Sequence, residues 1–111
     1  MVNQILVNEV EQKTNSMPPE LSAVLVILNA DNELKTKALP FVNVEKQEID
    51  WNGIFGNAFG SGHRAACVWA KSLWTDQAPA KVDAFDRAFS MSPGLRAAVI
   101  RALMIRWGLG H

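Results

Sequence analysis

A Gly-Ser-Gly turn at residues 60–62 leads directly into an amphipathic helix, and this stretch constrains the fold more than any other part of the sequence. Within residues 62–75, apolar side chains recur with the period of an α-helix. Arg64 and Lys71 fall on the polar side of the predicted helix. The apolar side carries Ala65, Ala66, Trp69, Ala70 and Leu73. The chemically mixed flank between these two sides carries His63, Cys67 and Trp74.

A second amphipathic helix is predicted just before this turn. Asp50 can cap it, because an aspartate side chain accepts hydrogen bonds from the free N–H groups of a first helical turn. The apolar residues that follow have the spacing of one helix face and are Trp51, Ile54, Phe55, Ala58 and Phe59. Gly60 is expected to end this helix and Ser61 to cap the next one, so the turn packs the two helices against each other.

Residues 21–28 are apolar at seven of eight positions and are expected to be buried. Pro18 and Pro19 precede them, and proline is tolerated in the first turn of a helix. A helix is therefore favoured here. The β-branched residues of this segment leave a buried strand as the alternative.

Extended structure is expected at two other places. Residues 1–17 are predicted to be loosely packed, with a short strand or hairpin as an alternative to helix. Residues 41–44 follow Pro40 and are expected to form an extended connector or a short edge strand. The predicted fold is mainly α, a compact single domain over residues 1–111 built as a bundle of four to five helices, with α+β as the alternative.

The last predicted helix is apolar around most of its circumference. It begins at Ser92-Pro93 and runs to about Trp107, where Gly108 is expected to stop it and Leu109 to make a Schellman-type contact. A helix of this kind is normally central in a fold or buried in an oligomer. A shorter amphipathic helix is predicted before it, built on Val82, Phe85 and Phe89.

Four residues of the last helix are the predicted contact surface: Ile100, Leu103, Met104 and Trp107. Tryptophan is enriched at interaction hot spots, and the chain contains four tryptophans. Because the apolar surface encircles this helix, we expect the protein to form a homodimer through it.

The charge is unevenly distributed although the formal net charge is zero. Residues 1–50 hold eight acidic and four basic side chains, a net charge of −4, and residues 51–111 hold three acidic and seven basic ones, a net charge of +4. Such asymmetry can mark a nucleic-acid face, or it can be neutralised within the fold or across a dimer. The arginines of the last helix point in three directions, which disfavours binding in a DNA groove. The alternative function is nonetheless binding of nucleic acid or another polyanion through Arg64, Lys71, Arg96 and Arg101.

The single cysteine cannot form an internal disulfide, so a reducing compartment is expected. The start of the chain lacks the basic and apolar regions of a signal peptide. The longest apolar run, residues 23–28, is too short to span a bilayer. We therefore expect a cytoplasmic protein without a membrane partner.

His63 and Cys67 are four residues apart on one predicted helix, so their side chains can meet. Such a pair is half of a zinc site or of a nucleophile arrangement. A structural zinc site needs four ligands, and the other histidine is His111, the last residue. Packing in the core is therefore favoured for Cys67, and no metal, cofactor or catalytic residue is predicted.

The start of the same helix is a candidate anion-binding site. Free backbone N–H groups at a helix N-terminus attract anions. The residues concerned are Ser61, Gly62 and Arg64. A tight turn between two helices explains the glycines equally well.

The segment Gly62-His63-Arg64-Ala65-Ala66, with Trp69 and Leu73-Trp74 after it, resembles a pattern in small uncharacterised bacterial proteins of phages, plasmids and other mobile elements. The likeness covers roughly residues 41–108. It implies a small helical accessory protein and carries no activity. The predicted function is a non-enzymatic interaction protein with an unknown protein partner or a second copy of itself. The flank of His63, Cys67 and Trp74, with Arg64 beside it, is the remaining candidate functional surface.

Overall fold

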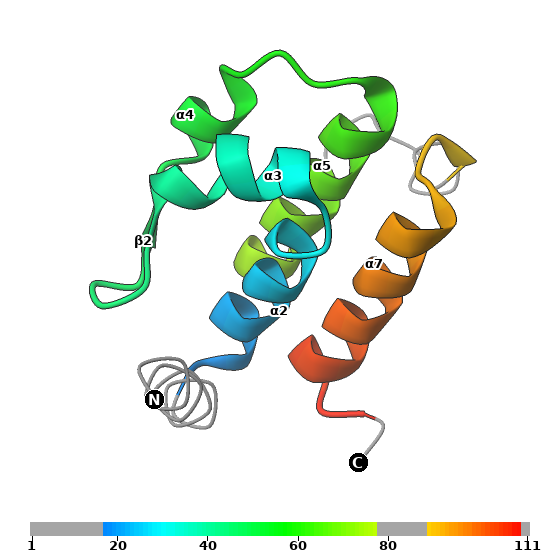
Figure 1. Cartoon of the computed structure of the whole chain (residues 1–111). Helices are drawn as coiled ribbons and strands as arrows, with labels where there is room; N and C mark the ends of the chain where they lie inside the picture. The colour runs from blue at the N-terminus through cyan, green and yellow to red at the C-terminus, as the bar shows by residue number, and fades with distance from the viewer. Residues whose placement is uncertain (1–16, 78–88, 110–111) are drawn as a thin grey trace, which may run out of the picture.

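Three helices, α2 (Pro19–Leu28), α5 (Ser61–Thr75) and α7 (Pro93–Arg106), form the body of the molecule (Figure 1). The computed structural model describes residues 17–77 and 89–109. Helix α2 packs against both α5 and α7, and these two helices also contact each other. Figure 1 shows that α2 and α7 run side by side in opposite directions. The prediction of a mainly α fold is confirmed.

Helix α2 is the central helix of the core. Pro18 is its N-cap and Pro19 its first residue, which confirms the helix start predicted from these two prolines. At the other end the Asn29 side chain donates a 2.8 Å hydrogen bond to the Leu25 carbonyl. The strand alternative for this segment is therefore wrong. Its fully buried apolar residues are Leu21, Ala23, Val24, Ile27 and Leu28.

Helix α7 was expected to be either central in the fold or buried in an oligomer. The first of these expectations is wrong, because α7 is not central. Only one side of α7 packs against the core, and the buried residues of that side are Leu95, Ala98, Val99 and Ala102. The central place belongs to α2, because its apolar residues extend over both of the sides that α5 and α7 cover.

Both predicted ends of α7 are confirmed. Ser92 Oγ accepts a hydrogen bond of 3.3 Å from the Leu95 N–H, which caps the first turn. Gly108 has a φ of +67°, and Leu109 N donates to Met104 O at 2.7 Å. Gly108 N also donates to Ile105 O at 3.2 Å, and these two bonds form the Schellman motif that glycine permits at this position.

A small hairpin extends from one side of the helical body (Figure 1). It follows α3 (Asn32–Lys37) and the 3-10 turn η1 (Leu39–Phe41), and pairs β1 (Val42–Asn43) with β2 (Glu48–Ile49) in antiparallel register. Gln47 has a φ of +55° in the turn. The extended structure expected for residues 41–44 is confirmed for Val42 and Asn43, whereas Phe41 belongs to the 3-10 turn and Val44 to the hairpin turn. The strand considered near the N-terminus falls on residues 1–16, outside the described part of the chain.

Helix α4 (Trp51–Phe55) begins as predicted but ends before Phe59. Asp50 Oδ1 accepts a 3.0 Å hydrogen bond from the Gly53 N–H, so the predicted cap is present. The helix stops early because the Asn57 side chain donates to the Gly53 and Ile54 carbonyls, which continued helix would have used.

Helix α5 also begins slightly differently from the prediction. Its N-cap is Gly60, and Ser61 is its first residue, without a capping bond from the Ser61 side chain. The short helix expected around residues 82–89 falls largely outside the described residues. Across residues 17–77 and 89–109, every helix is too short or too polar to span a bilayer.

Candidate functional site

His63 projects from the first turn of α5 toward the first turn of α3. Its Nε2 lies 2.9 Å from Asp31 Oδ2, and its Nδ1 lies 3.8 Å from Glu33 Oε2. The same Asp31 oxygen accepts hydrogen bonds from the Glu33 N–H and the Leu34 N–H, at 2.9 and 3.3 Å. Since this oxygen acts only as an acceptor, Nε2 of His63 carries the proton of the bond. His63 therefore joins the N-terminus of α5 to the capping residue of α3.

The pKa of Asp31 is lowered below its ordinary value by this arrangement. Partial burial alone would raise that pKa, but the Leu34 N–H, the charge of His63 and the Glu33 N–H all favour the ionised carboxylate. Asp31 thus acts as a charged cap that also bonds His63, a structural role that stabilises both helix ends.

A second set of bonds fastens α3 to the segment after α4. Lys37 Nζ donates to the Ala58 carbonyl at 2.8 Å and lies 5.6 Å from the centre of the Phe59 ring. Asn57 Nδ2 donates to the Lys37 carbonyl at 3.0 Å. These contacts and the His63 bond hold α3 at both of its ends.

Cys67 is fully buried in the core cluster, to which α2, α5 and α7 contribute most of the residues. Burial raises the pKa of its thiol to about 11, against the opposing effect of the Arg64 charge. The nucleophilic form of cysteine is the thiolate, which burial disfavours. His63 makes its hydrogen bond with Asp31, which belongs to another element, and no bond joins His63 to Cys67 among the contacts of the described residues.

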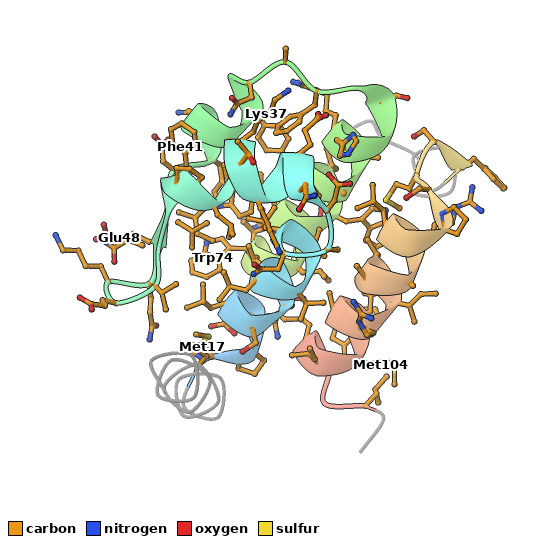
Figure 2. All side chains as sticks on the ribbon, viewed as in Figure 1. Met17, Lys37, Phe41, Glu48, Trp74 and Met104 are labelled. Atoms are coloured by element: carbon orange, nitrogen blue, oxygen red, sulfur yellow. The ribbon has the colours of Figure 1, made fainter. Side chains whose placement is uncertain are left out.

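Trp74 and Arg64 have surroundings of their own. Trp74 is half-buried and packs against the core, where Figure 2 labels it. The guanidinium of Arg64 lies 5.5 Å from the centre of the Phe55 ring, and Lys71 Nζ lies 5.9 Å from the same ring. Arg64 and Lys71 therefore share an aromatic neighbour that the sequence did not indicate.

The candidate anion site at the start of α5 faces a packed segment. A Cβ atom at Gly62 would collide with the Ser90 carbonyl oxygen, so only glycine allows this approach. A carbonyl oxygen repels an anion. The position of Gly62 is thus explained by close packing of the chain before α7 on α5.

The exposed side of α7 carries three large apolar residues in helical register. Ile100 is 58% exposed, Met104 37% and Trp107 59%. Their spacing of four and three residues places them on one face of the helix. We call Ile100, Met104 and Trp107 the α7 ridge. Leu103, the fourth predicted contact residue, is partly buried and packs against the core at the edge of this ridge.

The arginines of α7 have different surroundings. Arg106 Nε donates a 2.9 Å hydrogen bond to the Leu73 carbonyl, and its guanidinium lies 3.8 Å from Asp76 Oδ1. Arg96 donates to the Phe89 carbonyl at 3.1 Å. Arg101 is exposed. Arg106 therefore fastens α7 to the end of α5, and no continuous basic stripe runs along α7.

An open groove of about 620 Å³ lies beside the hairpin. Its lining residues are Pro40, Phe41, Val42, Asn43, Val44, Glu45, Glu48 and Asp50. Within residues 17–77 and 89–109, the groove included, no three histidine, cysteine, aspartate or glutamate side chains are grouped so as to hold a metal ion.

No protein-family model, curated protein or solved structure matches this chain. The resemblance of residues 41–108 to small proteins of mobile elements therefore stays a prediction, and the function has to be argued from the surfaces described above.

Proposed function

We propose that this protein is a small non-enzymatic interaction protein that associates with a second copy of itself through the α7 ridge. The observation that carries the proposal is the exposure of Ile100, Met104 and Trp107 side by side on one helix face. Isolated exposed apolar residues are ordinary on protein surfaces, whereas contiguous ones mark interaction sites. Trp107 is of the residue type most enriched at hot spots.

The polar side chains that first suggested a functional site are instead used within the fold, which leaves the ridge as the candidate contact surface. The His63–Asp31 bond and the Lys37 contacts connect elements of the fold to each other. The Cys67 thiol is buried. The α7 ridge, in contrast, contributes little to the core, because the packed side of α7 is the opposite one.

The proposal is tested by replacing Ile100 with serine and measuring the molar mass by light scattering over a range of concentrations. Ile105→Ser is a matched control, because Ile105 is on the same helix and partly exposed, and Arg101 separates it from the ridge around the helix. We expect the wild type and Ile105→Ser to associate and Ile100→Ser to stay monomeric. Equal association of all three would refute the proposal.

The alternative, binding of nucleic acid through Arg64, Lys71, Arg96 and Arg101, is examined with the same protein. Contacts with phosphates make affinity fall steeply with added salt. A titration with duplex DNA and with single-stranded RNA at low salt, repeated at higher salt, would support this alternative if it gave salt-dependent affinity that Arg101→Ala weakens. We expect no such affinity.

A further inference from the structure

The surface that α7 offers to a second copy is basic as well as apolar. Residues 89–109 contain no acidic residue, and Arg96 and Arg101 flank the ridge on α7. Arg106 lies on the packed side of the helix, where it contacts Leu73 and Asp76. If two copies met through α7 alone around a two-fold axis, the same patch would face itself. Arginine would then lie near arginine across the interface, and such like-charge contacts are unfavourable.

The opposite kind of surface exists at the hairpin end. The groove beside the hairpin is lined by the acidic residues Glu45, Glu48 and Asp50, and no lysine or arginine lines it. Its apolar lining includes the half-buried Phe41 and Val42. Lys46 lies in the hairpin turn, outside this lining. The exposed lining of the groove is therefore mostly polar and acidic, with a smaller apolar part, and its negative charge is complementary to the arginines that flank the ridge.

The two surfaces are on opposite sides of the molecule. Figure 1 shows the hairpin projecting from one side of the helical body and α7 forming the other side. Figure 2 labels Glu48 on the hairpin and Met104 near the C-terminal end of α7. A contact between them is consequently made by two different copies.

We infer that self-association is head to tail: the α7 ridge of one copy docks on the acidic hairpin groove of the next. This inference rests on the proposed function, since it takes the ridge as one half of the contact. A heterologous contact leaves one ridge and one groove unfilled at the ends of each assembly. Assemblies larger than a dimer therefore form as the concentration rises.

The test uses two blocked variants in sedimentation velocity. Ile100→Ser removes the ridge and keeps the groove, whereas Glu48→Lys reverses a groove charge and keeps the ridge. We expect each variant alone to associate at least about tenfold more weakly than the wild type. An equimolar mixture is expected to form a 1:1 complex, because each variant supplies the surface that the other lacks.

The pairing of Arg101 on α7 with Glu48 in the groove is tested by exchanging the two charges. Arg101→Glu in a chain that also carries Glu48→Lys is expected to associate more strongly than either single variant. Added salt is expected to weaken association of the wild type, because it screens opposite charges. A ridge that met a second ridge would instead associate more strongly in salt.

The outcomes separate the two proposals. If Glu48→Lys associates as the wild type does while Ile100→Ser stays monomeric, the head-to-tail inference is overturned and the proposed function stands. If Ile100→Ser associates as the wild type does, or if the wild type stays monomeric at all concentrations, the proposed function fails and the inference fails with it. Circular dichroism of both variants checks that each is folded.

Discussion

His63 Nε2 lies 2.9 Å from Asp31 Oδ2, and this hydrogen bond joins the start of α5 to the start of α3. The two residues are 32 positions apart in the sequence. Asp31 is also the N-cap of α3, so one carboxylate serves two helices. The residue that first suggested chemistry on α5 thus has a structural partner.

A double-mutant cycle tests this pairing. Asp31→Asn keeps a capping side chain, because asparagine caps about as well as aspartate, but removes the charge that faces His63. We expect His63→Gln and Asp31→Asn each to lower the free energy of unfolding by about 1–2 kcal/mol, as is typical of hydrogen bonds to charged groups. The double variant should lose clearly less than the sum of both. Additive losses in urea unfolding would show that the two side chains are not coupled.

The lowered pKa of Asp31 makes part of the stability dependent on pH. A carboxyl whose pKa is lower in the folded state than in the unfolded chain stabilises the fold at pH values above its ordinary pKa of 3.8. This contribution is lost as the pH falls through the lowered value. We expect the difference in unfolding free energy between the wild type and Asp31→Asn to shrink as the pH falls below about 4. A difference that stays unchanged in acid would contradict the pKa shift.

Cys67 should be chemically silent in the folded protein. Its buried thiol, with a pKa of about 11, is both shielded from reagents and protonated near neutral pH. At about pH 8 we expect no reaction with a thiol reagent in the native state and reaction of one thiol per chain in denaturant. Rapid labelling of the native protein would place Cys67 at the surface.

Alanine substitutions at Gly62 and Gly60 test how closely the chain before α7 packs on α5, with Gly60 as the control position. Alanine at Gly62 would collide with the Ser90 carbonyl oxygen, whereas alanine at Gly60 meets nothing within 4 Å. We expect Gly62→Ala to lower the unfolding free energy by about 1–3 kcal/mol through overpacking, although alanine is the better helix former. Gly60→Ala should cost less, up to about 1 kcal/mol, because it meets no steric conflict and only replaces the glycine N-cap of α5 by the poorer alanine. Thermal unfolding of both variants measures the contrast, and equal effects would argue against the close approach.

The parts of the fold that were predictable depend on neighbours in the sequence. The caps at Asp50 and Ser92 and the Gly108 stop follow from local hydrogen bonding, which short patterns reveal. The early end of α4 depends on Asn57. The side chain of Asn57 also donates a hydrogen bond to the backbone carbonyl of Lys37, which is distant in the sequence. Periodicity of apolar residues carries no information about such a bond.

The candidate site was predictable to a smaller extent. The exposed ridge residues Ile100, Met104 and Trp107 were all among the proposed contacts, because an apolar helix has more apolar surface than a small core can cover. Asp31 was not identified. An aspartate before a short helix signals a cap, but its pairing with His63 arises only when α3 and α5 come together.

The central claim, self-association through the α7 ridge, is tested most directly by sedimentation equilibrium of the wild-type protein over a wide concentration range. The account predicts a weight-average mass that rises from that of one chain as concentration increases, and a flat value for Ile100→Ser under the same conditions. A wild-type mass that stays at one chain up to the highest concentration would contradict it.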